Sequence, residues 1–366
     1  MTNRIRILRG YKKHALKLIF GSFYHPNYFE AERKARKKIP SLTNDFSFLK
    51  RARCFISGFN SDKLIWYDFK KYDRKLYISD LEHYRDMERI GAPYYYVAHD
   101  KLVFEHYFQG LCQLVESMGV IHNGFFYKIK DDGNINNLDE LIDSMIAGKT
   151  YFFKPRTGGS GRGIFKVFSR ANQLYYNTDC ISREQLKNIL SELTGYLVQD
   201  EFSQTGFSHD IWPHTLNTIR VTTMLLPGEE PFVAWSFHRF GTGKAIVDNV
   251  ASGGLIAPIE PLEGVMKHIY SLSKDGRLTR FDSHPASGEA VYDVKVPNWN
   301  EIVNLAVRLH AKIPFLPICG WDLVLSGEDV YVQELNYNPD IYVGQILGPL
   351  LLNGNVKRFY DYYIKK

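Results

Sequence analysis

Helical periodicity is the clearest pattern along the chain. Apolar residues recur at three- or four-residue spacing in several segments, flanked by residues that typically start or stop a helix. Asp100 is a typical N-cap and Gly119 a typical end, while Ser182 begins a segment whose charge order suits a helix. The pattern predicts helices over 79–90, 100–119, 138–148, 182–193 and 298–313.

Strand patterning fills much of the remaining chain. Short apolar or aromatic runs between turn residues predict strands over 150–155, 163–168, 195–202, 217–226, 231–241, 319–327 and 329–336. Because helices and strands fall into separate blocks, we expect an α+β fold rather than one doubly wound sheet. We expect three units: a basic, partly helical N-terminal region (1–98), a central lobe (99–205) and a strand-rich C-terminal lobe (206–366).

Composition narrows the class of protein. The chain has 366 residues, of which 45% are hydrophobic and 23% charged, so a sizeable core is expected and wholesale disorder is not. The four cysteines are far apart and form no CxxC pair, which argues against a zinc site or a disulfide framework. We therefore expect a reducing compartment, the cytoplasm. No stretch reaches the roughly 18 apolar residues that a membrane span needs.

The net charge of +6 is concentrated near the N-terminus, between Arg4 and Arg53. Such a basic region can attract nucleic acid or an anionic membrane surface. Residues 5–20 alternate apolar and basic positions in a loosely helical rhythm, typical of an interfacial helix. The simpler alternative is a solvated basic helix packed on the body. We expect no nucleic-acid partner, and we leave peripheral membrane contact and the oligomeric state open.

A glycine-rich turn follows the strand that carries Lys154. Gly158, Gly159, Gly161 and Gly163 lie within six residues. A Walker A loop is excluded because Ile164 stands where its lysine would follow Gly163, and a dinucleotide fingerprint fails at the same residue. Glycines let backbone N–H groups approach anionic oxygens, and a strand-anchored lysine supplies a point charge. Further donors in the segment are Arg156, Ser160 and Arg162. The alternative is an ordinary flexible hairpin.

Acidic and amide side chains gather on the last predicted hairpin. Asp322 stands on one strand, and Glu334 and Asn336 stand on the next, two residues apart and therefore on one face. Two carboxylates and an amide are hard oxygen ligands of the kind that Mg²⁺ prefers together with nucleotide phosphates. The alternative is a hairpin face held by salt bridges and hydrogen bonds.

Taken together, these motifs resemble those of a known family. Lys101 in HDKL, Lys154 in FFKPRTGGSGRG, the strand YLVQDEF and the acidic set in GWD and VQELNYNPD resemble an ATP-grasp enzyme. The segments NTIRVTT, VDNVASGG, SHPASGE, GWDLVL and ELNYNP resemble the sugar-transfer-associated ATP-grasp branch, which is linked to polysaccharide biosynthesis. The resemblance covers roughly residues 72–348. It implies two α+β lobes that grip ATP.

The resemblance also implies roles for individual residues. Lys101 and Lys154 would contact the nucleotide phosphates under a flap formed by 157–163, and the backbone of 199–202 would read the adenine. These cofactor-binding residues are Lys101, Lys154, Arg156, Gly158, Gly159, Ser160, Gly161, Arg162, Gln199, Asp200, Glu201 and Phe202, with Asp210 as the candidate ribose acid. Mg²⁺ would be held by Asp322, Glu334 and Asn336.

The sequence departs from the family pattern at two places. Gln199 stands where a glutamate is common, and Gly320 and Trp321 stand where the family often has an arginine before the metal-binding acid. Arg220 and Arg239 on other predicted strands are the candidates to supply that charge and, with Lys154, to assist catalysis. A buried arginine in a strand must be paired or face an anion, so a structural salt bridge is the alternative for Arg220.

Two further groups of residues have open roles. The polar turn with Asp248, Asn249 and 252–254 either lines the acceptor side or is a plain hairpin loop. His238 and His284 fit a hydrogen-bonded structural role better than that of a general base.

Three functions are compatible with the motifs. The first is an ATP-dependent ligase that activates a carboxylate as an acyl phosphate and joins it to an amine. The second is a kinase that phosphorylates a sugar or other hydroxyl, and the third is a non-catalytic nucleotide-binding scaffold. We expect Asp322→Asn, Glu334→Gln and Lys154→Ala to abolish ATP turnover with little loss of fold.

Overall fold

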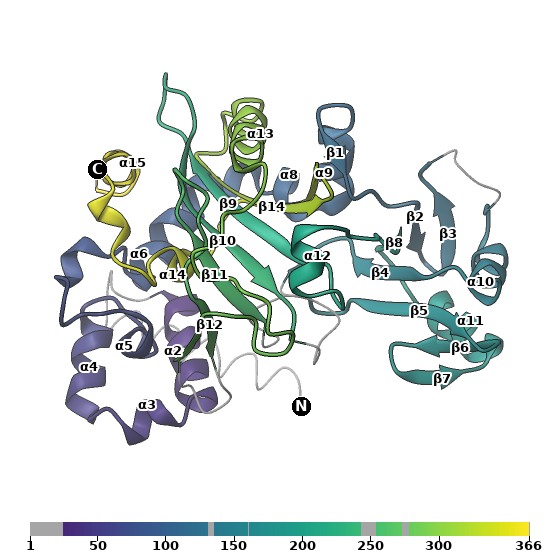
Figure 1. The fold of residues 1–366 in the computed structure, drawn as a ribbon, viewed down its shortest axis with the longest axis horizontal. Coiled ribbons are helices and arrows are strands. Elements are labelled where there is room, and N and C mark those ends of the chain that lie inside the picture. Colours follow the sequence, from purple (N-terminus) through teal and green to yellow (C-terminus); the bar gives the residue numbers. More distant parts are fainter. Residues whose placement is uncertain (1–24, 131–134, 160, 243–253, 273–277, 366) are drawn as a thin grey trace, which may run out of the picture.

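The chain folds around two β-sheets, with short helices grouped at one end (Figure 1). The structure is a computed structural model that describes residues 25–130, 135–159, 161–242, 254–272 and 278–365. Several predictions therefore lie outside the described residues: the basic segment 5–20, Ser160, Asp248, Asn249 and Ser252. Among the described residues, no helix is both long and apolar enough to cross a bilayer.

The N-terminal region is built from short helices. They are α2 (Pro26–Lys38), α3 (Ser41–Asn44), α4 (Phe48–Ile56), α5 (Lys63–Trp66), η2 (Arg74–Leu76), α6 (Asp80–Glu82), η3 (His83–Met87), α7 (Glu88–Gly91), η4 (Ala92–Tyr94) and α8 (Tyr96–His99). Ser79 and Glu82 form a reciprocal capping box at the start of α6. The helix predicted over 79–90 therefore forms, as α6, the π-helical turn η3 and α7.

The central lobe holds an antiparallel seven-stranded sheet in the order β3-β2-β8-β4-β5-β6-β7. Its strands are β2 (Gly119–His122), β3 (Phe125–Lys128), β4 (Tyr151–Pro155), β5 (Phe165–Arg170), β6 (Gln173–Tyr176), β7 (Asp179–Ile181) and β8 (Tyr196–Asp200). Helices α10 (Leu138–Ile146) and α11 (Arg183–Ser191) share a core with Tyr151 and Phe153 of β4. Because side chains alternate along a strand, Phe152 and Lys154 face the other side of this sheet.

The C-terminal lobe holds an eight-stranded sheet in the order β1-β15-β14-β9-β10-β11-β12-β13. Its strands are β1 (Gln113–Leu114), β9 (Thr218–Met224), β10 (Phe232–Phe240), β11 (Leu255–Ile259), β12 (Ile269–Leu272), β13 (Leu278–Phe281), β14 (Ile318–Ser326) and β15 (Asp329–Asn336). The accompanying helices are α12 (Phe207–Ile211), α13 (Trp299–Ala311), α14 (Ile341–Gly344), η6 (Leu350–Leu352) and α15 (Gly354–Tyr363). The predicted strands over 217–226, 231–241, 319–327 and 329–336 are confirmed as β9, β10, β14 and β15.

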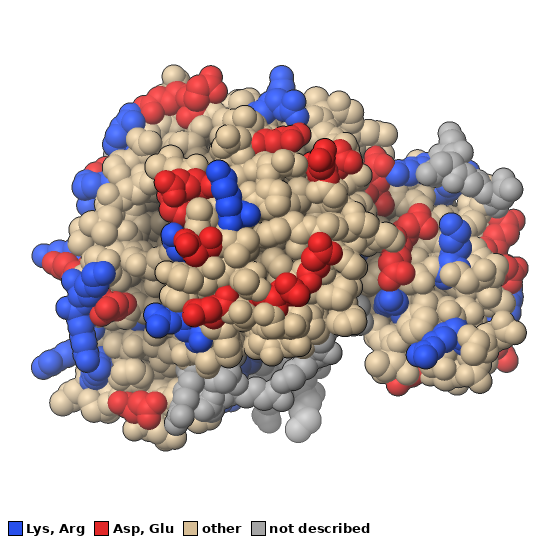
Figure 2. Space-filling view, in the orientation of Figure 1, with Lys and Arg blue, Asp and Glu red and all other residues tan. Residues whose placement is uncertain are grey.

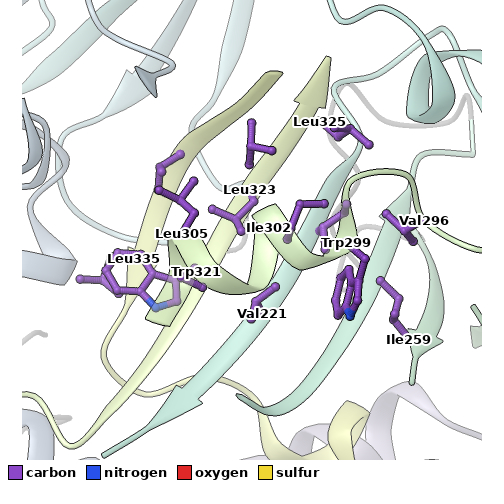
Figure 3. Packing of buried hydrophobic residues seen from close by; sticks show 14 of the residues in the cluster. Val221, Ile259, Val296, Trp299, Ile302, Leu305, Trp321, Leu323, Leu325 and Leu335 are labelled. Atoms are coloured by element: carbon purple, nitrogen blue, oxygen red, sulfur yellow. The ribbon is translucent and has the colours of Figure 1, made fainter. Parts of the chain in front are cut away.

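Helix α13 covers one face of the eight-stranded sheet (Figure 3). Ile302 and Leu305 of the helix belong to the same buried cluster as Val221, Trp321 and Leu323 of the sheet. Complete burial of such a side chain contributes about 1.5–3 kcal/mol. This face is therefore a continuous apolar core that fixes how β9 and β14 lie.

The opposite face of the same sheet changes character along the strands. At one end, Met224, Trp235 and Ile318 pack with Cys54 and Phe59 of the N-terminal region. At the other end the buried residues of β9, β10 and β14 are polar or charged: Thr218, Arg220, Arg239 and Asp322. The sheet thus has an apolar end that docks the N-terminal helices and a charged end that borders the central lobe.

The segment from 100 to 119 differs from the predicted single helix. Asp100 does cap the helix, accepting bonds from the N–H groups of Leu102 and Val103. However, α9 (Lys101–Phe108) ends at Phe108 and not at Gly119, where β2 begins. The reason is tertiary pairing: β1 joins β15 in parallel, and residues 119–121 pair with β8. Sheet partners outweigh the helical pattern beyond 108.

Candidate functional site

A cavity of about 390 Å³ lies between the two sheets, at the charged end of the C-terminal sheet. Most predicted site residues line it: Lys101, Lys154, Gly158, Gly159, Gly161, Arg162, Gln199, Asp200, Glu201, Phe202, Arg239, Asp322 and Glu334. Four predicted residues do not line it: Arg156, Asp210, Arg220 and Asn336. Residues from distant parts of the sequence therefore meet around one space.

A row of side chains crosses adjacent strands of the C-terminal sheet, and two of its members, Asp322 and Glu334, line the cavity. Arg220 of β9 lies opposite Asp322 of β14, which lies opposite Glu334 of β15. Phe237 of β10 continues the row on the far side of Arg220, whose guanidinium lies 5.9 Å from the ring centroid. Directly opposed residues point to the same face of an antiparallel sheet. We call Arg220, Asp322 and Glu334 the charged row.

A β-bulge sets which residues of β15 face the cavity. Asp322 pairs with Glu334, but the next residue, Leu323, pairs with Val332, so β15 carries one extra residue. This lets both Val332 and Leu335 face the apolar core while Glu334 stays on the cavity face. The extra residue, Gln333, lines the cavity, and its buried Oε1 has no hydrogen-bond partner among the described residues. Gln333 is a candidate ligand acceptor that no sequence motif indicated.

Asp322 is held by two arginines. It is only 3% exposed, and its carboxylate pairs with the Arg220 guanidinium, with Nη2 at 2.8 Å, and with Nη2 of Arg239 at 2.9 Å. Arg239 also donates from Nε to the Thr218 hydroxyl at 2.8 Å. Burial disfavours the charged carboxylate, but the two guanidinium groups outweigh it and hold the pKa of Asp322 below its ordinary value. Both predicted arginines thus reach the same acid.

The side-chain oxygens near the charged row suit a divalent cation that also binds a phosphate group. Asn336 lies across from Gly320, and its amide nitrogen is 3.4 Å from Asp322 Oδ2. Glu334 makes a longer ion pair than Asp322, with Lys101 Nζ at 3.8 Å from Glu334 Oε1. In the described part of the chain, no three His, Cys, Asp or Glu side chains form a metal-binding cluster. Mg²⁺ commonly binds through one or two carboxylates plus substrate phosphates, which these residues can accommodate.

The central-lobe wall carries two lysines on neighbouring strands. Lys154 of β4 contacts the Gln199 side-chain oxygen, and the Gln199 amide group donates to backbone carbonyls of the 115–116 segment. Lys166 of β5 lies opposite Phe152, on the Lys154 face, and pairs with Glu201 at 2.8 Å. Lys166 and Glu201 both line the cavity. Lys166 was not among the predicted site residues, although its place one strand from Lys154 was readable from the predicted hairpin.

The base of the glycine-rich turn is tied to the start of α9. The Arg156 guanidinium binds both carboxylate oxygens of Asp100, and Lys101 N–H donates to the Arg156 carbonyl at 3.0 Å. Lys101 Nζ donates to the Gly158 carbonyl at 3.1 Å. Arg156 therefore anchors the turn instead of facing the cavity, which differs from its predicted contact with the nucleotide.

The turn itself leaves room for a ligand to approach its backbone. Gly158 has φ +108°, a conformation that other residues rarely adopt. A Cβ placed on Gly158 or Gly159 would meet no atom within 4 Å. Backbone N–H groups here can come close to anionic oxygens, as predicted for a phosphate-covering flap.

Asp210 is not brought to the cavity. Its side chain on α12 is 73% exposed, and its neighbour His209 is the residue of that helix that lines the cavity. The physical reason is helix direction, since consecutive residues of a helix point about 100° apart. Asp200 and Glu201, at the end of the hinge strand β8, are acids that do line the cavity.

The two singled-out histidines have structural surroundings. His238 is fully buried, lies 2.9 Å from the Ser208 hydroxyl, and has its pKa lowered to about 3 by burial. His284 is also buried and lies 3.0 Å from the Gly241 carbonyl. Neither lines the cavity. Both are therefore neutral structural groups rather than bases of this site.

Comparison with known proteins identifies the family. The family model described as sugar-transfer associated ATP-grasp matches residues 92–359, most of the chain. The chain therefore belongs to the sugar-transfer associated ATP-grasp family, and the α+β, ATP-grasp assignment from the motifs is confirmed. A search of curated proteins found no match.

Solved structures show a distant likeness. D-alanyl-alanine synthetase A from Vibrio cholerae is 11% identical, with a TM-score of 0.40, and the match covers 74% of this chain and 66% of that one. An ADP complex of N5-carboxyaminoimidazole ribonucleotide synthetase is 9% identical, with a TM-score of 0.36, and the match covers 66% and 45%. An ATP complex of carboxyaminoimidazole ribonucleotide synthase from Aspergillus clavatus is 11% identical, with a TM-score of 0.35, and the match covers 66% and 45%. The chain thus matches only about half to two thirds of the length of these proteins.

Proposed function

We propose that this member of the sugar-transfer associated ATP-grasp family is an ATP-dependent ligase. It would activate a carboxylate as an acyl phosphate and join it to an amine, linking an amino acid or amino sugar to a sugar acid in surface-polysaccharide biosynthesis. One observation carries the proposal. Five charged residues from separate parts of the fold line the same cavity: Lys101, Lys154, Arg239, Asp322 and Glu334. The family match supports an ATP-dependent, ligase-like activity.

The charge of the cavity suits a nucleotide triphosphate. Among the residues that the structure describes, five cationic side chains line it against four carboxylates: Lys101, Lys154, Arg162, Lys166 and Arg239 against Asp200, Glu201, Asp322 and Glu334. Asp322 is already neutralised by its arginines, and Glu201 pairs with Lys166. On the C-terminal wall, Glu334 is therefore the acid left to attract a cation. Such a site favours a polyanion that arrives with a divalent cation.

Each wall would bind a different part of the nucleotide. Lys154 and Lys101 would contact phosphate oxygens, with the turn at 157–163 over them. The hinge segment 199–202 would hold the adenine, with Glu201 near the ribose. Asp322, Glu334 and Asn336 would hold Mg²⁺, which when bound neutralises phosphate charge.

The chain's residues would act mainly by position and charge. A carboxylate oxygen of the acid attacks the γ-phosphorus as its bond to ADP breaks, forming the acyl phosphate. The amine nitrogen then attacks the acyl carbon, phosphate leaves with the C–O electron pair, and the nitrogen loses a proton. Lys154 and Arg239 stabilise charge on the transferring group, and Arg220 holds Asp322 in place. No protein nucleophile is needed.

The test is a screen of ADP release over amino acids crossed with uronic acids, with products identified by mass spectrometry. We expect ADP and free phosphate only when a matching acid and amine are both present, and a product lighter than their sum by one water. Lys154→Ala in the same screen controls for contaminating ATPases. Absence of ADP release from every pair, while ATP still binds, would favour the scaffold alternative.

The kinase alternative gives a different product. Transfer of the γ-phosphoryl group to a hydroxyl yields a stable phosphorylated sugar, no amide and no free phosphate. Both reactions use the same Lys154 and charged row, so the product decides between them.

We also infer a peripheral membrane contact at the cytoplasmic face, through the N-terminal region. Helix α4 exposes Phe48 (70%), Leu49 (67%) and Ile56 (72%). Basic residues of the same helix are Lys50, Arg51 and Arg53. Blue side chains also gather at the edge of the N-terminal region in Figure 2. Exposed apolar and basic residues together suit the surface of an anionic bilayer.

Vesicle sedimentation tests the membrane contact. We expect binding to phosphatidylserine-containing vesicles to fall when Phe48 and Leu49 are both replaced by serine. Ile146→Ser, which removes an exposed apolar residue of α10, is the matched control. Equal binding by all three proteins would contradict the contact.

A further inference from the structure

A second, smaller recess lies between the N-terminal helices and the segment after β15. Its volume is about 140 Å³. Figure 1 places α2, α5, α6 and α14, which surround it, at one end of the molecule. We call it the polar recess, and it is lined by Ala31, Asn60, Asp62, Lys63, Asp80, His83, Tyr84, Asp340, Ile341 and Tyr342.

The polar recess contains buried polar atoms that lack partners. Asn60 is 2% exposed and His83 is 7% exposed. Asn60 Oδ1, His83 Nδ1 and Asp62 Oδ1 make no hydrogen bond to any described residue. Buried acceptors without partners are costly and rare in native structures. The atoms themselves are buried, but their residues line the recess, so a ligand that donates hydrogen bonds would satisfy them once these side chains turn toward it.

The acids in the recess outnumber the cations. Lys63 Nζ is held by Asp62 at 2.9 Å and by Asp80 at 3.1 Å, and Asp80 also accepts the Asn60 N–H. Asp340 is a third acid that lines the recess. Burial lowers the pKa of His83 to about 4, so its imidazole adds no positive charge at neutral pH. The recess therefore favours a cation over an anion.

The kind of cation that the recess would bind can be inferred from its acceptors. In the part of the chain that the structure describes, these acids do not form a metal-binding cluster. A primary ammonium carries three N–H donors. Three residues with side-chain oxygen acceptors line the recess and could receive them: Asn60, Asp62 and Asp340. Tyr84 and Tyr342 also line the recess, and aromatic rings are favourable neighbours for an ammonium group and the carbon bonded to it.

The recess adjoins the charged row. Arg220 pairs with Asp322 on the cavity side and interacts electrostatically with Asp340 and Tyr342 on the recess side. Pro339, the neighbour of Asp340, packs closely against Gly320, two residues before Asp322. The recess therefore lies next to the charged row, whose acids Asp322 and Glu334 line the large cavity.

We propose that the polar recess binds a primary ammonium group of the amine substrate and so selects the acceptor of the ligase. The assignment of the recess as the acceptor site rests on the proposed function. The binding of a small primary amine to the recess does not depend on that function. The anchored ammonium stays protonated among the carboxylates, so it is an orienting group. The nitrogen that attacks the acyl carbon would then be a second amino group of the same molecule, and the acceptor would carry two amino groups.

Binding of matched small probes tests the recess directly. Ethanolamine and D-glucosamine carry the ammonium, ethylene glycol and D-glucose are their neutral counterparts, and glycolate is an anion. With the full-length protein, saturation-transfer NMR should show both amines bound and the other three not. Binding of the neutral probes at similar strength, or no binding of either amine, would overturn the proposal.

Variants locate the binding. Asp62→Asn and Asp340→Asn keep the side-chain shape and should weaken amine binding at least tenfold. Asp45→Asn, on the exposed surface of the same region, is the matched control and should bind like the wild type. Unchanged binding in both recess variants would overturn the assignment. Nucleotide binding by each variant checks its fold.

The two proposals can fail separately. Lys154→Ala should lose ATP turnover yet retain amine binding in the recess. If wild type binds amines and shows no ATP-dependent ligation, the proposed function fails and the recess stands. If ligation occurs and Asp62→Asn and Asp340→Asn leave the KM for the amine unchanged, the recess assignment fails.

Discussion

The two walls of the large cavity are built in opposite ways. The C-terminal wall sets charges in the fixed register of a sheet, and Asp322 is nearly inaccessible between Arg220 and Arg239. The central-lobe wall offers half-exposed lysines and a glycine turn with open space beside Gly158 and Gly159. The C-terminal wall is preorganised, whereas the central-lobe wall can adjust to a ligand that enters the cavity. Charges on the first wall are therefore structural as well as functional, whereas those on the second are mainly functional.

Substitution of Asp322 should have the largest effect. Asp322→Asn leaves two buried guanidinium groups without their anion, and breaking a buried pair costs about 3–5 kcal/mol. We expect the free energy of unfolding to fall by that amount in urea denaturation, together with loss of ATP turnover. This prediction differs from the expectation of little loss of fold, because the structure pairs Asp322 with both Arg220 and Arg239.

Glu334→Gln is the matched control for Asp322→Asn on the same wall. Its side chain is 24% exposed and its ion pair with Lys101 is 3.8 Å long, so we expect a change in the free energy of unfolding below about 1 kcal/mol. If Asp322→Asn is as stable as Glu334→Gln, the C-terminal wall is not held by its charges and the contrast between the walls is wrong.

Lys154→Ala tests the adaptable wall. Removing one preorganised donor that stabilises charge in a transition state costs about 10²–10³-fold in kcat, and we expect a loss of that order here. Stability should change little, because Lys154 is only partly buried and contacts the neutral Gln199 side chain. Steady-state ADP release measures the loss of activity, and thermal denaturation of the same samples measures the change in stability. A large drop in Tm would place Lys154 with the structural charges.

The glycine turn allows a finer test. Gly158 and Gly159 both have room for a methyl group, but only Gly158 has a positive φ, of +108°. Gly158→Ala should strain the turn by roughly 1–3 kcal/mol and lower kcat/KM for ATP by about tenfold. Gly159→Ala should stay within about twofold of wild type. Equal effects of the two substitutions would show that the backbone conformation of the turn is unimportant.

Acid should weaken the preorganised wall. Because burial lowers the pKa of His238 on β10 from 6.5 to about 3, the unfolded chain binds its proton first as pH falls. The contribution of His238 to stability is complete above pH 6.5 and declines below it, by about 1 kcal/mol between pH 6.5 and 5.5. Urea denaturation at both pH values should show a smaller decline in His238→Gln. An identical decline in that variant would mean that His238 is not the group responsible.

The sequence predicted the parts of the fold that depend on local pattern. The strands carrying Arg220, Arg239, Asp322 and Glu334 show clear alternation, and a hairpin across Gly327 was enough to place Asp322 beside Glu334. Side-chain positions that depend on distant partners were not predicted. Arg156 turns to Asp100 instead of the cavity because α9 begins beside the turn.

The polar recess shows the same limit more sharply. Its acids lie at 62, 80 and 340, and no local spacing connects them. Helix α9 likewise ends at Phe108 because β15 and β8 provide sheet partners for β1 and β2, and the helical pattern alone cannot reveal such distant partners.

Equilibrium binding of ATP, with and without Mg²⁺, tests most directly whether the two walls form one nucleotide site. We predict that wild type binds ATP, that Lys154→Ala weakens binding at least tenfold in both conditions, and that Glu334→Gln weakens it only when Mg²⁺ is present. Failure of the wild type to bind ATP, or an equal loss for Glu334→Gln in EDTA, would contradict the account.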